Sequence, residues 1–111
     1  MTQLFRSLIF VPGNNPRFLE KAKKIKADIV CFDLEDSVHN DEKTSARKLI
    51  KNALKSRSEY HSSIFVRINS PLSGKIPSDL KEIIQKGIDG IVIPKVNNIT
   101  KLKKYKKLFL I

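Results

Sequence analysis

The chain has 111 residues, a length suited to one domain, and its 22 Lys and Arg against 11 Asp and Glu give a net charge of +11 with neutral histidines. Hydrophobic residues make up 41% of the chain, which is enough for a core and argues against a disordered segment. The sequence contains no apolar run of 18 residues, no secretory signal pattern and only one cysteine, so we expect a cytoplasmic protein without a membrane span.

The positive charge is spread along the chain rather than arranged in a nucleic-acid-binding pattern. Lysines occur singly or in pairs at helical spacings, and the one dense cluster lies at 101–107. Aromatic residues that could stack on bases form no patterned set. We therefore interpret most lysines as a solvated surface and do not expect a nucleic-acid partner. A basic polyanion-binding protein remains the alternative.

The first part of the chain predicts a strand, a loop and a helix. An apolar run predicts a strand near residues 7–12, and Pro16 opens a helical pattern. The apolar face of that helix is expected to hold Phe18, Leu19, Ala22 and Ile25. The loop between them, at 12–15, would let the backbone approach a ligand and exposes N–H groups that favour an anion. An ordinary turn is the alternative interpretation.

The second predicted strand, near residues 29–34, runs into a turn rich in carboxylates. This acidic turn (33–36) contains Asp33, Glu35 and Asp36. Three carboxylates in four residues repel one another unless a cation or an arginine compensates their charge. They could hold Mg²⁺ directly or through water, or orient an arginine, and Asp41 is better placed to cap the next helix. Cys31 lies within the strand and is expected in the core rather than as a nucleophile.

A charged residue interrupts the third apolar strand, which is predicted near residues 64–69. The guanidinium of Arg67 must be paired or face a cavity, because burial of an unpaired charge is costly. Its donors suit bidentate capture of a ligand carboxylate, and a structural ion pair with the acidic turn explains it equally well. The following helix is expected to begin with Ser78 as its N-cap and to stop at Gly87.

The fourth apolar run predicts a strand near residues 90–94, followed by a lysine-rich helix. Lys95 could meet a phosphate or a carboxylate, or be solvated, and the isolated His39 and His61 are interpreted as surface residues. Four successive strand–helix units predict an α/β fold with parallel strands and crossover helices. Ligands bind at the carboxyl ends of such strands, and the unusual polar residues follow those ends.

Five segments, taken together and in chain order, resemble a known family. They are 6–16, 27–38, Lys43 with Ala46 and Arg47, 66–69, and 93–96. These segments are similar to the first four strands and loops of the citrate lyase β-subunit family, which includes malyl-CoA lyases and belongs with the HpcH/HpaI aldolases. The resemblance covers nearly the whole chain.

The resemblance implies a (β/α)8 TIM-barrel fold and a Mg²⁺-dependent carbon–carbon lyase. Such an enzyme cleaves a 3-hydroxyacyl thioester, carried by CoA or by a carrier protein, into an oxo-acid and an acyl thioester. Arg67 would bind the oxo-acid carboxylate, and Glu35 and Asp36 would lie near the metal, either as outer-shell groups or paired with Arg67. Phe10 and Lys21 match positions that contact CoA. Substrate-binding roles are also expected for Asn15, which replaces an arginine of some relatives, and for Lys95.

The family barrel needs about 250 residues, and four units make half of it. We therefore expect residues 1–111 to form the N-terminal half of a barrel, inactive alone. By the resemblance, the direct Mg²⁺ ligands lie beyond Ile111, on later strands. A homo-oligomer or a complementing C-terminal half would then complete the enzyme. The remaining alternative is a non-catalytic binding or assembly module derived from the same barrel.

Overall fold

The computed structural model describes residues 7–94, whose framework is a four-stranded parallel sheet. The strands are β1 (Leu8–Pro12), β2 (Ile29–Asp33), β3 (Ser63–Arg67) and β4 (Gly90–Val92), in the spatial order β1-β2-β3-β4. The predicted α/β class with parallel strands is confirmed. Each strand begins within one residue of its predicted start, and β3 and β4 end two residues before their predicted ends. Ile68 still donates a backbone hydrogen bond to Val92 as the chain leaves the sheet.

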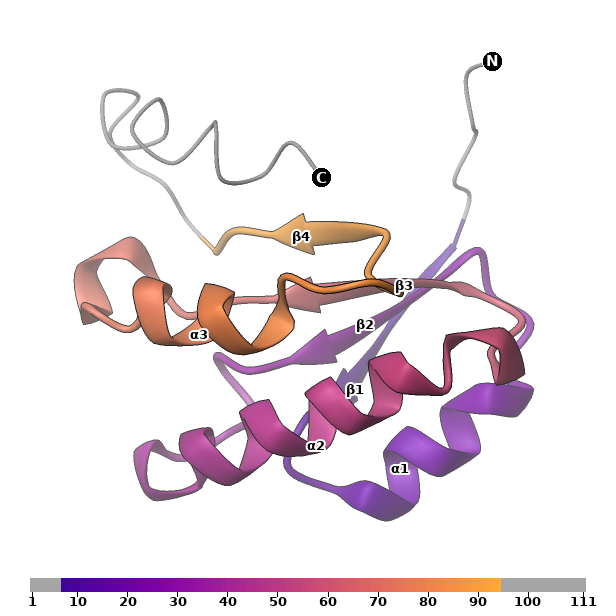
Figure 1. The fold of residues 1–111 in the computed structure, drawn as a ribbon, viewed down its shortest axis with the longest axis horizontal. Helices are drawn as coiled ribbons and strands as arrows, with labels where there is room; N and C mark the ends of the chain where they lie inside the picture. The colour runs from indigo at the N-terminus through magenta and orange to yellow at the C-terminus, as the bar shows by residue number, and fades with distance from the viewer. Residues whose placement is uncertain (1–6, 95–111) are drawn as a thin grey trace.

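Within residues 7–94, three α-helices and four short 3₁₀ helices connect the strands. The α-helices are α1 (Pro16–Lys21), α2 (Lys43–Lys55) and α3 (Ile76–Ile83). The 3₁₀ helices are η1 (Ala22–Lys24), η2 (Asn40–Glu42), η3 (Arg57–Glu59) and η4 (Pro71–Ser73). All three α-helices lie on the same side of the sheet (Figure 1). This one-sided arrangement is typical of a barrel wall, whereas a doubly wound sheet carries helices on both faces.

The hydrophobic core lies between the sheet and this helical layer. The buried core residues of the strands and of α2 include Val30, Phe32, Ile64, Val66, Ala46, Ile50 and Leu54. Tyr60 closes one end, because its ring packs edge-on against Phe32 and its hydroxyl donates a hydrogen bond to the carbonyl of Leu19. Side chains of a strand alternate between its two faces, so Phe10 and Cys31, which are neighbours in the register, belong to the face opposite this core.

Several local predictions need correction. Phe18 is 44% exposed, because one residue advances a helix by about 100° and the buried positions of the first helical segment are Leu19 and Ala22. The 3₁₀ turn of η2 precedes α2, so α2 begins at Lys43 and Asp41 makes no cap for it.

The third helix also differs from its predicted limits. It begins at Ile76, because Pro77 suits a first turn in which backbone N–H groups have no helical acceptor, and Ser78 therefore lies inside it. It ends at Ile83, where Ile84 turns extended, and Gly87 follows four residues later with φ of +111°. The predicted fourth helix lies outside the described residues. Within residues 7–94, none of the helices has the length and apolar character needed to cross a membrane.

Candidate active site

The carboxyl edge of the sheet brings together side chains from three strands. The register aligns Pro12 with Asp33 and Asp33 with Arg67, so the last residues of β1, β2 and β3 lie side by side. Asp33 and Arg67 fall on the face of the sheet opposite the helical core, because they alternate with core residues along their strands. In a barrel this face lines the interior, where ligands bind at the carboxyl end.

Asp33 and Arg67 form a bidentate ion pair. The Nε and Nη2 atoms of Arg67 lie 2.9 Å and 2.8 Å from the two carboxylate oxygens of Asp33. The same carboxylate accepts hydrogen bonds from the backbone N–H of Glu35 at 2.8 Å and from the N–H and hydroxyl of Ser37 at 2.9 Å and 2.8 Å. Burial alone would raise the pKa of Asp33, but these hydrogen bonds outweigh it and hold the pKa well below its usual range. Asp33 is therefore a fixed carboxylate.

Phe10 and Glu35 complete the surroundings of Arg67. The Phe10 ring centroid lies 4.3 Å from the guanidinium carbon, which is a cation–π distance, and a Glu35 carboxylate oxygen lies 4.0 Å from Nε. The hydrogen bonds to Asp33 raise the pKa of Arg67, with a further contribution from the charge of Glu35. Nη1 and the second hydrogen of Nη2 have no partner among residues 7–94. Within the described part of the chain, this end of the guanidinium is therefore unpaired.

A pocket of about 390 Å³ opens at Arg67. It is lined by Glu35, Asp36, Arg67, Ser70 and Pro94. The structure therefore brings Arg67, Glu35 and Asp36 together, as the sequence analysis places them. The structural interpretation of Arg67 is confirmed by its ion pair with Asp33, whereas capture of a ligand carboxylate by the same guanidinium stays a prediction.

The other predicted site residues lie apart from this pocket or outside the described residues. Asn15 is the N-cap of α1, and its side-chain oxygen accepts hydrogen bonds from the backbone N–H groups of Arg17 and Phe18. Lys21 is the last residue of α1, about 8 Å along the helix from Pro16. Lys95 is not described.

Gly13 serves the packing of the loop rather than the approach of a ligand. A Cβ at this position would lie 2.5 Å from the backbone oxygen of Asp33, and the N–H of Gly13 donates to that oxygen at 2.9 Å. The lack of a side chain therefore lets the loop after β1 lie against the end of β2. The interpretation of this loop as a ligand-approaching turn is corrected at Gly13, whose N–H is already used.

Sequence reasoning missed a buried polar network beneath the acidic turn. Lys43 is only 7% exposed, and its ammonium donates hydrogen bonds to the carbonyls of Leu34 and Glu35 and to the side-chain oxygen of Asn69. Burial lowers the pKa of Lys43, and the charges of Asp79 and Glu35 oppose that shift. In a chain with 22 Lys and Arg, nothing in the sequence pattern distinguishes Lys43 from a surface lysine. Its only signal is its position in the third segment of the family resemblance.

The described residues do not form a metal-binding shell by themselves. Residues 7–94 contain no cluster of three or more His, Cys, Asp or Glu that could hold a metal ion. Asp33 already accepts five hydrogen bonds, so its oxygens are engaged. Glu35 and Asp36 lie in the pocket lining, with the Glu35 side chain 29% exposed. An outer-shell role for these two carboxylates stays a prediction.

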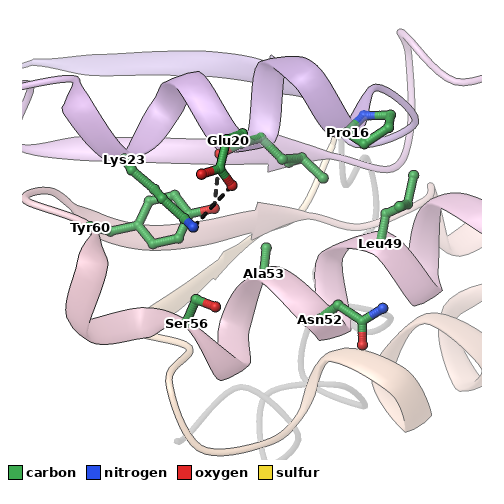
Figure 2. Close-up of a pocket in the computed structure, with 9 residues that line it drawn as sticks. Pro16, Glu20, Lys23, Leu49, Asn52, Ala53, Ser56 and Tyr60 are labelled. Atoms are coloured by element: carbon green, nitrogen blue, oxygen red, sulfur yellow. Dashed lines mark hydrogen bonds and ion pairs between the residues drawn. The ribbon is translucent and has the colours of Figure 1, made fainter.

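A second hollow, of about 170 Å³, lies on the helical layer (Figure 2). It lies between α1 and α2, beside an ion pair of 2.9 Å between Lys23 and Glu20 and near the Tyr60 ring.

Burial, with a contribution from the charge of Asp33, raises the pKa of the Cys31 thiol to about 12, so this cysteine is no nucleophile. Neither feature places an ion-paired arginine beside two further carboxylates as the carboxyl-edge pocket does.

Comparisons with known proteins identify the family and several relatives of the chain. Residues 6–110 match the family described as HpcH/HpaI aldolase/citrate lyase. A (3S)-malyl-CoA thioesterase of Cereibacter sphaeroides (strain KD131) is 39% identical over 99 residues, which cover 89% of this chain and 35% of that protein. The citrate lyase subunit beta of Leuconostoc mesenteroides subsp. cremoris is 39% identical over 106 residues, covering 96% of this chain and 35% of that protein.

A solved structure shows the same arrangement of elements. Protein CitE from Mycobacterium tuberculosis, in complex with magnesium, acetoacetate and coenzyme A, superposes with a TM-score of 0.71 at 25% identity and covers 87% of this chain and 34% of its own. Its fold is TIM-barrel-like, and the four parallel strands correspond to part of it. The chain spans about one third of the length of these relatives. It belongs to the HpcH/HpaI aldolase/citrate lyase family.

Proposed function

We propose that the chain forms part of a Mg²⁺-dependent carbon–carbon lyase that cleaves a 3-hydroxyacyl thioester into an oxo-acid and an acyl thioester. One observation carries the proposal: Asp33 holds one edge of the Arg67 guanidinium and leaves its end free at a pocket that also contains Glu35 and Asp36. The names of the relatives, a citrate lyase subunit and a malyl-CoA thioesterase, support a thioester substrate. The acetoacetate and coenzyme A bound by the CitE neighbour support the same substrate class.

The residues of this chain would act mainly by binding and orientation. Arg67 would hold the oxo-acid carboxylate through two parallel N–H···O bonds, which fix its plane as well as its position. Because Asp33 and Phe10 already hold the guanidinium, little side-chain freedom is lost when the substrate binds. Glu35 and Asp36 would orient water molecules of the metal. Mg²⁺, when bound, would offset the negative charge that develops on the oxo-acid oxygen.

The remaining substrate contacts belong to the same proposal. Phe10 would present the exposed part of its ring to the CoA portion while it stacks on Arg67. Lys21 would meet the CoA phosphates, although it stands at the far end of α1 from the pocket. Asn15 retains only its amide nitrogen for a ligand, because its oxygen caps α1. Lys95, which lies outside the described residues, would bind a phosphate or a carboxylate.

The proposed enzyme also needs the rest of its barrel, a cellular compartment and a thioester carrier. The rest of the barrel, with the direct metal ligands, would come from a complementing C-terminal half, or the enzyme would be completed in a homo-oligomer. A reducing cytoplasm suits the single buried cysteine. The thioester carrier would be CoA or a carrier protein.

A second candidate is hydrolysis of a malyl-CoA-type thioester. Relatives at 39% identity are named (3S)-malyl-CoA thioesterase, which supports this reaction class. Hydrolysis breaks the carbon–sulfur bond and releases a free thiol and a hydroxy acid. Lyase cleavage breaks a carbon–carbon bond and keeps the thioester intact, so the products separate the two candidates.

The test is product analysis with the native protein and any chain that copurifies with it. Malyl-CoA and citryl-CoA are incubated with and without Mg²⁺, and oxo-acid, acyl thioester and free thiol are quantified. The proposal expects equal amounts of oxo-acid and acyl thioester only when Mg²⁺ is present. Free thiol with a hydroxy acid would favour the hydrolase, and no turnover of either substrate would favour a binding or assembly module.

A matched pair of variants links the activity to the site. Arg67→Lys keeps the charge but removes the planar fork, so kcat/KM should fall roughly 10- to 100-fold. Arg57→Lys is the control, because Arg57 also pairs with an aspartate, Asp89, at 2.9 Å but lies before β3, at the opposite end of the sheet from the pocket. Equal losses in both variants would contradict a substrate-binding role for Arg67.

A further inference from the structure

The strongest feature outside the pocket is a buried cation held by neutral oxygens. Lys43, the first residue of α2, directs its ammonium at the carbonyl oxygens of Leu34 and Glu35, at 2.7 Å and 2.9 Å, and at the side-chain oxygen of Asn69. An ammonium has three hydrogens, and these three acceptors use all of them. Lys43 therefore joins the acidic turn after β2 to the segment after β3.

The far side of this junction is tied back to α2. Asn69 donates its backbone N–H and its side-chain N–H to one oxygen of Asp79 in α3, each at 2.8 Å. The other oxygen of Asp79 accepts from Nε of Arg47 at 2.7 Å, and Arg47 lies in α2 one turn after Lys43. Asp79 is fully buried and Asn69 nearly so. The acidic turn, the end of β3, α3 and α2 are thus closed into one ring of polar contacts.

Glu35 is the residue on which this ring acts most directly. Its backbone N–H donates to Asp33, and its carbonyl accepts from Lys43, so its backbone is held from both sides. Its side chain is left 4.0 Å from Nε of Arg67 and lines the pocket. Burying an ammonium costs free energy, which an apolar side chain of similar length would not require. What the ammonium provides in return is a fixed position for the carbonyls of Leu34 and Glu35, to which it donates.

We propose that Lys43 is a positioning residue, which locks the acidic turn against the segment after β3 and so sets where Glu35 stands beside Arg67. The inference deepens the proposed lyase function, and its consequence for turnover rests on that function. Lys43 touches the backbone of the turn and not the pocket, so its role is exercised through Glu35.

The test compares Lys43→Met with Lys51→Met in the native protein. Methionine keeps most of the apolar length of lysine and removes the donors. Lys51 lies on the same helix two turns later and pairs with Glu82 at 3.4 Å, but its side chain is 44% exposed. Amide hydrogen exchange is measured at Glu35 and Ser37 of the turn, and at Leu34, whose N–H donates to the carbonyl of Arg67 in the sheet.

In Lys43→Met, exchange at Glu35 and Ser37 should accelerate about tenfold or more, while exchange at Leu34 stays within about twofold of the unchanged protein. Lys51→Met should leave all three amides unchanged. Unchanged exchange at the turn, or equal acceleration at Leu34, would overturn the positioning role. If Lys43→Met fails to fold, Lys43→Gln, which keeps donors without the charge, replaces it. In that variant, exchange at Glu35 and Ser37 must likewise accelerate more than exchange at Leu34.

Turnover supplies the second measurement. Lys43→Met should lower kcat for thioester cleavage about tenfold or more and leave KM within about twofold, since Arg67 keeps its partner Asp33. An unchanged kcat with a loosened turn would overturn the link between Lys43 and catalysis. If the unchanged protein cleaves no thioester, the proposed function fails, and the exchange data still decide whether Lys43 positions the turn.

Discussion

Replacing Asp33 with asparagine tests the ion pair on which the site is built. Asp33 is 1% exposed and accepts two hydrogen bonds from Arg67, one from Glu35 and two from Ser37. Asparagine has nearly the same shape, but one of its two acceptor oxygens becomes an NH₂ group. That group would face donors of Arg67 or of the turn, and the guanidinium would lose its counter-charge.

The expected loss in the free energy of unfolding is about 3–5 kcal/mol at pH 7, the usual cost of removing one partner from a buried ion pair. The loss should depend on pH. The folded-state pKa of Asp33 lies well below its unfolded value of about 4, so the ion pair stabilises the fold fully above that value. The stabilisation is lost as the pH falls from about 5 towards the folded-state pKa. The difference between the two proteins should therefore shrink in acid.

Urea unfolding followed by circular dichroism at pH 7, 5 and 3 measures this difference. Asp36→Asn is the matched control, because Asp36 is an exposed carboxylate of the same turn and should change stability by less than about 0.5 kcal/mol at pH 7. Equal stability of Asp33→Asn and the unchanged protein at pH 7 would refute the reasoning. So would a difference that grows as the pH is lowered.

Three further predictions concern residues around this pair. Phe10→Ala removes the ring 4.3 Å from the guanidinium carbon of Arg67 and should weaken oxo-acid binding about two- to fivefold by calorimetry, whereas Phe10→Tyr should retain it. Cys31, with a pKa raised to about 12 by burial, should react with a thiol reagent at pH 8 only after denaturation, and rapid reaction of the folded protein would contradict its burial. Gly13→Ala places a Cβ 2.5 Å from the backbone oxygen of Asp33 and should lower the free energy of unfolding by about 1–3 kcal/mol, so an unchanged urea midpoint would count against the packing described.

Apolar runs were sufficient to predict the sheet. Strands buried on the helix side consist of consecutive apolar residues, and turn residues mark their ends, so β1 to β4 could be located within two residues. Helix limits were less predictable, because they depend on contacts between distant segments. Phe18 looks like a core residue by spacing, yet the sheet buries Leu19 and Ala22 instead. Ser78 looks like a cap, yet α3 begins two residues earlier.

The pocket was predictable in part for the same reason. Charged residues at strand ends stand out against apolar neighbours, so Arg67, Glu35 and Asp36 could be selected before the structure was known. Lys43 and Asp79 could not be, because a lysine and an aspartate near helix starts are ordinary surface residues in most sequences. Only the fold reveals that both are buried.

The most direct test of the account is the state of the Arg67 guanidinium when an oxo-acid binds. Nitrogen-15 NMR of arginine-labelled native protein, with glyoxylate and Mg²⁺ added, observes Nε and the two Nη atoms separately, and Arg67→Lys identifies their signals. We predict that glyoxylate shifts the Nη signals and leaves Nε, which Asp33 holds, nearly unchanged. No shift at saturating glyoxylate, or a shift of Nε that reports loss of the Asp33 pair, would contradict the central claim that the free end of Arg67 binds the substrate carboxylate.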